Sequence, residues 1–421
     1  MAVDDPRDLH APILDAIREA TRKRLVADVP VGAFLSGGID SSAVVAAMAE
    51  QSSETVKTFS IGFESERFDE LEHARRVAEL YGTEHHEFVV RPDAIHIAPK
   101  MARHYGEPFA DASAIPCFYL AELTRRHVTV ALNGDGGDES FGGYTRYVAN
   151  HYAGRIDDAL PALLRRALGQ SGSSLGNGDP GRVANKIRRM RASLALDPAD
   201  RYRNYVSWLD DPERTGLYTP EYVQLLSEGG GSRVIRDPFE RASGADLVDK
   251  LLEVDVNTYL PGDLLPKIDI ATMAYALEAR SPLLDHSLME FAASIPAEFK
   301  VRGREKKWIL REALRTWLPS EILDRPKQGF MVPLSDWFRG DLRSHLRSVL
   351  LDRRALDRGY FQRGAVEELL DRHDRGADGA AKKLWALYMF ELWHHEYVDA
   401  APSSITAVSA QPFSELEPTG A

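Results

Sequence analysis

The sequence predicts an α/β protein in which a doubly wound parallel sheet is followed by a mostly helical half. Three observations lead to this fold class. Short apolar strands alternate with helical patterns over the first 150 residues, and the strand signal ends near Val148. Two glycine-rich turns also begin where an apolar strand ends, and doubly wound sheets bind ligands beyond the carboxyl ends of their strands.

The elements of the first half follow from the spacing of their apolar residues. Helices repeat apolar residues every three or four positions, as Ile13, Ile17 and Ala20 do, whereas the strands are short apolar runs. In order, we expect a helix at 8–26, a strand at 32–35, a helix at 42–50, a strand at 56–63, a helix at 69–81, a strand at 85–90, helices at 92–104 and 115–127, and a strand at 128–132. Strands that alternate with helices in this way form parallel βαβ units.

The second half shows helical patterns without strands. They cover residues 183–196, 199–208, 246–259, 267–278, 285–294, 305–317, 341–350, 363–374 and 380–397. The Gly- and Ser-rich segment 171–181 is predicted to be a mobile loop, and the segment 401–421 a flexible tail. We therefore divide the chain into an α/β half at 1–150, a helical half at 151–400 that completes a shared site, and the tail.

Composition excludes several classes of protein. The 421 residues carry 52 basic and 64 acidic side chains, and the net charge of −12 disfavours a nucleic-acid partner. The single cysteine, Cys117, excludes an internal disulfide and suits a reducing cytoplasm. No stretch is long and apolar enough for a membrane span, and no signal-like segment opens the chain. We expect a cytoplasmic protein with neither nucleic-acid nor membrane partners.

Residues 34–42, with the sequence FLSGGIDSS, are predicted to bind an anion. A strand that turns through two glycines into a helix leaves backbone N–H groups unpaired, and the serines add hydroxyl donors. No lysine follows the glycines, so the segment is not the GxxxxGK[ST] nucleotide loop. Because Asp40 would repel a bare phosphate, its presence favours a divalent cation between carboxylate and phosphate. A tight turn with a helix N-cap is the structural alternative.

The segment resembles the SGG-x-DS pyrophosphate loop of ATP pyrophosphatases, and the whole chain resembles the synthetase domain of asparagine synthetases. Four further motifs carry this resemblance in family order. They are residues 132–139 (LNGDGGDE) with 141–144 (FGGY), residues 259–285 with YLP, KID and LEARSPLLD, residues 307–311 (KWILR) and residues 325–330 (RPKQGF). The resemblance implies an ATP-pyrophosphatase fold, also described as adenine nucleotide alpha-hydrolase-like, with ATP and Mg²⁺ as cofactors.

The resemblance also implies a set of residues around the nucleotide. Serines and glycines of the first turn would cradle pyrophosphate, while residues after the second and fourth strands would border adenine and ribose. The nucleotide-binding set consists of Leu35, Ser36, Gly37, Gly38, Asp40, Ser41, Ser42, Ile61, Asn133, Gly134 and Lys327. Asp40 and Asp138 match the family's two Mg²⁺ ligands, although Asp138 can also be read as a turn residue.

Four residues are expected to act in catalysis. Lys307 matches the family lysine that contacts the phosphates, with Lys306 as the alternative one residue away and a charged helix start as the structural reading. Asp135 occupies the family's acidic position beside the acyl adenylate, where a carboxylate orients or deprotonates the incoming nitrogen. Glu278 and Arg280 belong to the motif that faces this site. Arg280 is expected either to bind a substrate carboxylate or to pair with Asp285.

Three residues depart from the family pattern near the acceptor pocket. Asn133 stands where a serine is more usual, Ser140 replaces an apolar residue, and Ser281 replaces valine. Asn133 can still hydrogen-bond ribose or substrate. These changes bear on the identity of the acceptor more than on adenylation.

The source of nitrogen is a further open point. Glutamine-dependent members of the family begin with a glutaminase domain whose N-terminal cysteine attacks glutamine, whereas here Met1 is followed by Ala2 and Cys117 is internal. We expect the chain to use free ammonia, another amine, or ammonia from a separate glutaminase subunit or domain. A homodimer is left open.

The leading prediction is an ATP-dependent amide ligase that adenylates a carboxylate, with the aspartate side chain and ammonia as the first pair. The alternatives are a biosynthetic amidotransferase or β-lactam- or peptide-cyclase-type synthetase that acts on another acid, and an inactive nucleotide-binding subunit. The adjacent pairs His85–His86 and His394–His395 are not expected to share a metal, because neighbouring side chains diverge on a strand or a helix.

Overall fold

The computed structural model describes residues 5–400 apart from 64–70, 91–92, 162–163, 165–191, 230, 232, 326–331 and 378. The predicted loop at 171–181, most of the predicted helix at 183–196, the predicted tail and Lys327 therefore lie outside the described residues.

A five-stranded sheet, parallel throughout, forms the centre of the α/β part. Its strands occur in the order β3-β2-β1-β4-β5. They are β1 (Val31–Phe34), β2 (Lys57–Phe63), β3 (Glu84–Val90), β4 (Val130–Leu132) and β5 (Glu278–Arg280). Because the chain extends from β1 to one edge and then returns to β4 on the other side, the sheet is doubly wound, as predicted.

The fifth strand corrects the prediction that strands end near Val148. Residue 278 was placed in a helix at 267–278, but Glu278–Arg280 pairs in parallel with β4 instead. The main-chain N–H of Glu278 donates to Thr129 at 2.9 Å, and that of Asn133 donates to Arg280 at 2.8 Å. A strand of three residues is too short to show a sequence period, so its pairing with β4 defines it.

Helices cover both faces of the sheet. Neighbouring residues on β1 point to opposite faces, so that Ala33 packs on one side of the sheet and Phe34 on the other. The first face carries α1 (His10–Arg24), α2 (Ile39–Gln51), α3 (Leu71–Tyr81), α16 (His286–Ser294) and α18 (Trp308–Leu314). The second carries α4 (Ala94–Tyr105), α5 (Ala114–Thr124) and α15 (Leu265–Met273).

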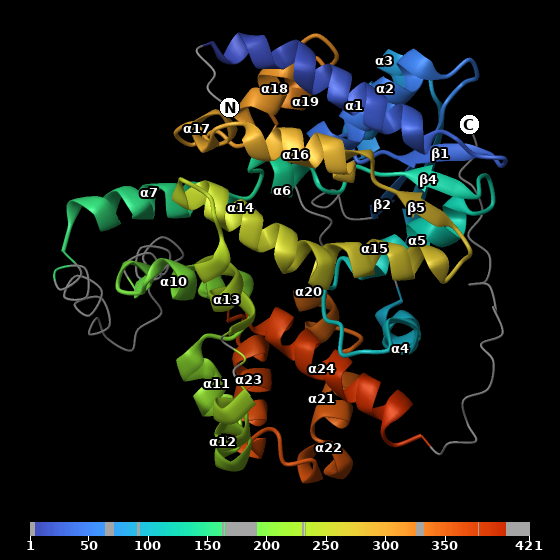
Figure 1. The fold of residues 1–421 in the computed structure, drawn as a ribbon. Helices are drawn as coiled ribbons and strands as arrows, with labels where there is room; N and C mark the ends of the chain where they lie inside the picture. Colours follow the sequence, from blue (N-terminus) through green and yellow to red (C-terminus); the bar gives the residue numbers. More distant parts are fainter. Residues whose placement is uncertain are drawn as a thin grey trace.

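The C-terminal helices extend the second face. In Figure 1, α1 and α16 lie in the upper part of the view, and α14 (Leu247–Asn257) and α15 cross its middle. The helices from α20 (Leu334–Arg339) to α24 lie below them, beside α11 (Asp211–Leu217) and α12 (Pro220–Gly229). The long helix α24 (Ala380–Tyr397) packs on α4, and its Trp385 is fully buried. One hydrophobic core therefore joins β1–β3 to the helices at the end of the described chain.

The remaining elements are helical. They are η1 (Pro6–Leu9), α6 (Gly137–Phe141), α7 (Thr145–Ala159), α10 (Pro198–Val206), α11 (Asp211–Leu217), α12 (Pro220–Gly229), α13 (Arg233–Arg241), α14 (Leu247–Asn257), the π-helix η3 (Leu260–Leu264), η4 (Pro282–Leu284), α17 (Ala297–Lys300), α19 (Ser320–Leu323), α20 (Leu334–Arg339), α21 (Arg343–Leu350), α22 (Arg353–Asp357) and α23 (Arg363–Asp374). The predictions at 363–374 and 380–397 match α23 and α24. None of the helices in the described part of the chain combines the length and the apolar character needed to cross a membrane.

Candidate active site

The two glycine-rich turns meet where the strand order reverses. β1 lies between β2 and β4, so the segments that follow β1 and β4 diverge and leave a crevice beyond the carboxyl ends of these strands. The turns approach each other closely here: a Cβ atom on Gly134 would lie 2.6 Å from the backbone nitrogen of Ser41. Only glycine permits this contact, which brings the second motif against the start of α2.

A cavity of about 1320 Å³ opens at this point and gathers most of the predicted residues. Its wall includes Leu35, Ser36, Gly38, Asp40, Ser41, Ile61, Asn133, Gly134, Asp135, Asp138 and Lys307. Gly37 and Ser42 belong to the same turn and helix but do not line the cavity, and Ser42 is fully buried within α2. The structure thus brings together residues that lie up to 272 positions apart in the sequence (307 − 35 = 272).

Glu278 and Arg280 do not reach this cavity, which corrects their predicted place in the site. They stand two residues apart on β5 and share a face that points toward the end of α1. Arg280 Nε lies 2.7 Å from Glu278, and its Nη1 donates to the carbonyl oxygens of Arg24 and Val26 at 2.8 and 2.9 Å. The predicted alternative partner, Asp285, instead pairs with Arg24 at 2.9 Å.

The first turn has the geometry of an anion cradle. Gly38 is the N-cap of α2, so the positive end of the helix dipole faces the turn. The hydroxyl oxygens of Ser36 and Ser41 are 3.1 Å apart, and the Gly38 N–H donates to Ser36 Oγ at 3.3 Å. Hydroxyl and amide donors therefore surround one position at the helix start.

Lys307 links the carboxylates of the two turns. Its ammonium lies 2.7 Å from Asp138 Oδ1 and also contacts Asp40, although the side chain is buried. Burial alone would lower the pKa of Lys307, but Asp138 and Asp40 raise it above its usual value. Lys307 also has a φ of 51°, the left-handed region that a residue other than glycine rarely adopts. This strained backbone starts α18 and aims the lysine at the cavity.

The pair of carboxylates suits a magnesium ion that accompanies a nucleotide. Mg²⁺ is held by one or two protein carboxylates together with phosphate oxygens and water, and Asp40 and Asp138 supply two oxygen ligands beside the anion cradle. Gly143 preserves the room that they need, because a Cβ there would overlap both Asp138 and the Lys307 side chain. The donor set therefore fits the predicted ion.

A second group of charged residues lines the cavity around Asp135, and the sequence analysis did not assign it. Lys267 Nζ lies 3.0 Å from Asp111 Oδ2, and Asp263 and Cys117 are close by. Burial would lower the pKa of Lys267, but its acidic neighbours, first Asp111, raise it. Burial, together with Asp111, raises the pKa of Asp263 to about 6.

The helix geometry explains why this group was missed. Asp263 lies within the π-helix η3 and Lys267 follows one turn later in α15, so that both face the cavity. A π-helix often marks a functional site, but the periodicity of the sequence does not reveal one. The available signal was an acid and a lysine four residues apart inside the third motif.

Two of the departures from the family pattern contact each other. Ser281 Oγ donates to Asn133 Oδ1 at 2.6 Å, and the same oxygen accepts the Asp135 N–H at 3.2 Å. The Asn133 side chain is thereby oriented, and in this structure it holds the turn that carries Asp135.

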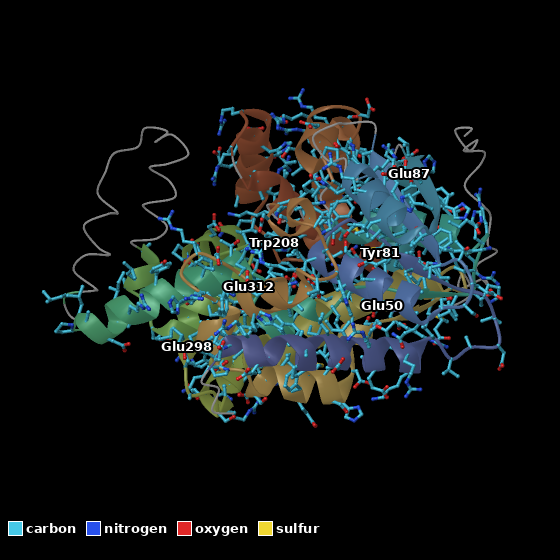
Figure 2. All side chains as sticks on the ribbon, turned by 90° about the horizontal axis from the view of Figure 1, so that it is seen from above. Glu50, Tyr81, Glu87, Trp208, Glu298 and Glu312 are labelled. Carbon is cyan, nitrogen blue, oxygen red and sulfur yellow. The ribbon has the colours of Figure 1, made fainter. Side chains whose placement is uncertain are left out.

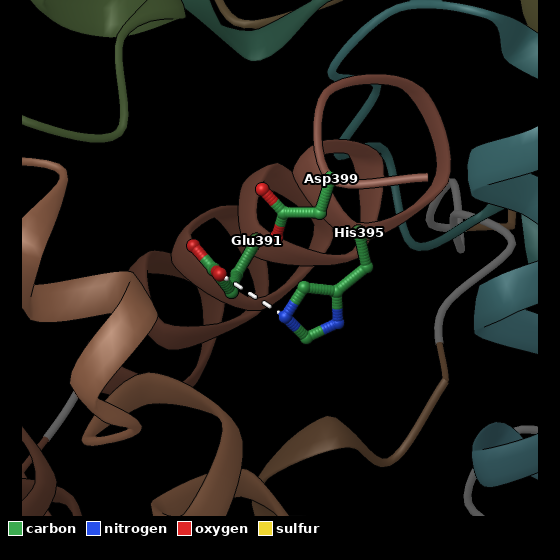
Figure 3. A group of neighbouring side chains, drawn as sticks. All are labelled: Glu391, His395 and Asp399. Carbon is green, nitrogen blue, oxygen red and sulfur yellow. Dashed lines mark ion pairs between the residues drawn. The ribbon is translucent and has the colours of Figure 1, made fainter. Parts of the chain in front are cut away.

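Outside this cavity, one cluster in the described part of the chain combines potential metal ligands. Glu391, His395 and Asp399 gather at the end of α24, with Glu391 Oε1 3.1 Å from His395 Nε2 (Figure 3). Arg358 lies 2.8 Å from Glu391 and 2.5 Å from Asp399. The cluster forms an ion-pair network that connects α24 to the end of α22.

The doubly wound sheet, the glycine turn and the converging carboxylates define an ATP-pyrophosphatase-like α/β protein. The chain belongs to the asparagine synthase family, because the model of this family matches residues 12–395.

Two curated relatives are named asparagine synthetases, and a third is named an amidase. The chain is 32% identical over 383 residues to the glutamine-hydrolyzing asparagine synthetase 1 of Bacillus subtilis, covering 91% of this chain and 58% of the relative. It is 35% identical over 405 residues to a putative glutamine-hydrolyzing asparagine synthetase of Mycobacterium tuberculosis, covering 94% and 59%. A fungal relative, the amidase chry2 of Gibberella zeae, is 26% identical over 401 residues, covering 88% and 59%. The chain thus spans somewhat more than half the length of these relatives.

Proposed function

We propose that this chain is the ATP-dependent, amide-forming part of a ligase. The acceptor carboxylate attacks the α-phosphorus of ATP, pyrophosphate leaves, and ammonia then attacks the acyl carbon to give the amide and AMP. The observation that carries this proposal is the convergence of Asp40, Asp138 and Lys307 on one position beside the glycine turn. Membership of the asparagine synthase family supports ATP as the nucleotide.

In this proposal the α/β half, residues 1–150, binds the nucleotide, and residues 151–400 complete the site. The turn from Ser36 to Ser41 holds the pyrophosphate, while Leu35 and Ile61 border the adenine. Magnesium, when bound by Asp40 and Asp138, neutralises phosphate charge. Lys307 stabilises the charge that builds up on the phosphates as each bond breaks. Lys327 is proposed from its motif alone.

The acceptor that we propose is aspartate, attacked by ammonia at its activated side chain. Its α-carboxylate and α-ammonium need a fixed cation and a fixed anion, and the cavity wall offers Lys267 together with Asp111 and Asp263. Asp135 lies in the same group, where its carboxylate can orient ammonia and take its proton. Holding both reactants in one cavity also supplies much of the rate of the second step through proximity.

A larger acid is the second candidate acceptor. The nucleotide and the acceptor would share one cavity of about 1320 Å³. Its wall also contains Tyr205 and Trp208, which are 41% and 48% exposed, and Lys382 Nζ lies 4.3 Å from the Trp208 ring centroid (Trp208 is labelled in Figure 2). An aromatic wall of this kind suits an acceptor with an extended or planar group.

The nitrogen source is proposed to be ammonia, either free or delivered by a separate glutaminase domain or subunit. The bacterial relatives are named as glutamine-hydrolyzing enzymes, and this chain corresponds to 58–59% of their length. Ammonium chloride is therefore the nitrogen donor for a direct assay, which removes any dependence on glutamine.

The deciding experiment measures acceptor-dependent release of pyrophosphate with Mg·ATP and ammonium, screened over aspartate, glutamate and larger acids. Release with aspartate, together with AMP and asparagine in equal amounts, supports the first acceptor. Release only with larger acids selects the second candidate. If no acid elicits release although Mg·ATP binds, the chain is a nucleotide-binding subunit without ligase activity.

A further inference from the structure

Arg325 contacts the phosphate turn from an element outside both glycine-rich motifs. Its Nη1 donates to the carbonyl oxygen of Gly37 at 3.2 Å. Gly37 stands between Ser36 and Gly38, and Arg325 lines the same cavity as these two residues. Arg325 begins the RPKQGF motif, in which the sequence alone assigns a role only to Lys327.

The turn is fixed on its other side by α3. Gly37 has a φ of +65°, and a Cβ there would lie 2.6 Å from the backbone nitrogen of Ala74. Burial and the charge of Arg325 lower the pKa of His73, so a neutral imidazole accompanies the guanidinium. Gly37 is therefore held between the start of α3 and Arg325.

The residue before Arg325 is tied to the helix that carries Lys307. Arg311 Nη2 lies 2.6 Å from Asp324 Oδ1, and the Arg311 N–H donates to the Lys307 carbonyl at 2.9 Å. Lys307 in turn contacts Asp40, which lies in the phosphate turn two residues after Gly38. The contacts thus form a closed circuit from the turn through Arg325, Asp324, Arg311 and Lys307 back to the turn.

Peptide geometry gives this circuit a consequence for phosphate binding. The carbonyl of Gly37 and the N–H of Gly38 belong to one planar trans peptide, so they point in opposite directions. A guanidinium that holds the carbonyl therefore also sets the direction of the Gly38 N–H, which points into the turn and donates to Ser36 Oγ at 3.3 Å in this structure. It further prevents the carbonyl dipole from turning toward a bound anion.

We propose that Arg325 is a positioning residue for the pyrophosphate part of the nucleotide, braced by the Asp324–Arg311 ion pair. The inference rests on the proposed function of the turn and adds the element that keeps its amide aimed. Arg325 acts through Gly37 and Gly38, while its charge favours the β- and γ-phosphates. The α-phosphate and the adenosine do not depend on it.

The test compares Mg·ATP with AMP, because AMP lacks the pyrophosphate part. Binding to the full chain is measured by calorimetry for Arg325→Ala, Arg325→Gln and Asp324→Asn. Loss of a charge-assisted hydrogen bond predicts that Arg325→Ala binds Mg·ATP about tenfold more weakly or worse. Arg325→Gln keeps a donor and is expected to retain part of this affinity. AMP affinity should change less than twofold in every variant.

Arg315→Gln is the matched control. Arg315 is exposed, caps the same helix, α18, and pairs with the half-buried Glu312 at 2.9 Å outside the cavity. It should bind both nucleotides as the parent chain does. Thermal melts of each variant show whether it folds. If a variant at position 325 does not fold, Arg325→Lys is measured in its place, and this variant is expected to retain part of the Mg·ATP affinity.

A double-mutant cycle tests whether the Asp324–Arg311 ion pair supports Arg325. If Asp324 acts through Arg311, then Asp324→Asn combined with Arg311→Gln weakens Mg·ATP binding less than the product of the two single effects. Equal loss of ATP and AMP affinity in Arg325→Ala, or no loss of either, would overturn the inference while leaving the proposed ligase function intact. A parent chain that binds neither nucleotide would overturn both.

Discussion

The ammonium of Lys307 lies 2.7 Å from Asp138 Oδ1 and also contacts Asp40, so one buried cation joins the two glycine-rich turns. The carboxylates come from motifs almost one hundred positions apart in the sequence (138 − 40 = 98). Without a cation between them they would repel each other in a poorly solvated site. Lys307 therefore holds the two turns together through their carboxylates.

Replacement of Lys307 by alanine is expected to lower turnover by about 10²–10³-fold, the usual effect of removing one preorganised charge-stabilising group. Pyrophosphate release at saturating ATP measures this loss. Lys306→Ala provides the comparison, since Lys306 is adjacent and its Nζ lies 3.5 Å from Thr145 Oγ1 rather than beside the carboxylates. A larger loss in Lys306→Ala than in Lys307→Ala would reverse the assignment.

Removal of magnesium is expected to weaken ATP binding strongly in the parent chain. The reason is that Asp40 and Asp138 repel phosphate unless a divalent cation lies between them. Calorimetric titrations with ATP in magnesium and in excess chelator measure the difference. In Asp40→Asn the dependence on magnesium should shrink, because one of the two proposed ligands has lost its charge. Identical ATP affinities with and without chelator in the parent chain would contradict the proposed metal site.

The contact between the two turns predicts that Gly134→Ala abolishes nucleotide binding. A methyl group would sit 2.6 Å from the backbone nitrogen of Ser41, and backbone atoms cannot move aside as a flexible side chain can. Gly364→Ala is the control: no atom would lie within 4 Å of its Cβ, and it lies exposed in α23. That change should stabilise the fold by about 0.5–1 kcal/mol. Nucleotide binding by Gly134→Ala at parent affinity would contradict this arrangement of the turns.

The sequence was sufficient to predict the parallel sheet because alternation of strands and helices is a local signal. It missed β5, whose three residues are recognised as a strand only through their bonds to β4. Glu278 and Arg280 were assigned to the site because they belong to the motif that the resemblance places there, and a motif does not show which way its side chains point. A strand of two-residue period turns both side chains toward α1 instead.

The nucleotide side of the cavity was easier to predict than the acceptor side. Glycine turns have a fixed sequence pattern, and Asp40 and Asp138 lie within them. On the other wall, Asp111 meets the cavity through tertiary packing, and Lys267 does so from α15, just after the π-helix. Arg325 reaches the phosphate turn from a loop, and none of these three settings has a comparable sequence pattern. Roles for these residues required the distances between elements.

The ionised carboxylate of Asp263 is expected to lower the stability of the folded chain at neutral pH. Burial and Asp111 raise its pKa from 3.8 to about 6, so the folded chain binds this proton more tightly than the unfolded chain. The free energy of unfolding should therefore fall as the pH rises from about 4 to about 6, by about 1–3 kcal/mol. Asp263→Asn removes this cost and should raise the melting temperature at pH 7.5 but not at pH 4.

Acceptor binding gives the second readout for Asp263. If its carboxylate holds the ammonium of aspartate, then Asp263→Asn raises the KM for aspartate and leaves the KM for ATP within about twofold. A variant that is more stable at pH 7.5 yet binds aspartate normally would remove Asp263 from the acceptor site while retaining the explanation of its pKa.

Arg280→Ala is expected to affect stability rather than catalysis. Its guanidinium joins β5 to the end of α1 through the carbonyls of Arg24 and Val26, and these bonds are lost together. Two charge-assisted bonds of this kind predict a loss of about 1–3 kcal/mol in the free energy of unfolding, measured by urea denaturation. The KM values for ATP and acceptor should stay within about twofold at a temperature where the variant is folded.

Glu278→Gln, which changes the exposed partner of the pair, should cost less than 1 kcal/mol, or about the value of a surface ion pair. A hundredfold loss of turnover in folded Arg280→Ala would instead restore Arg280 to the active site and require β5 to rearrange when substrate binds.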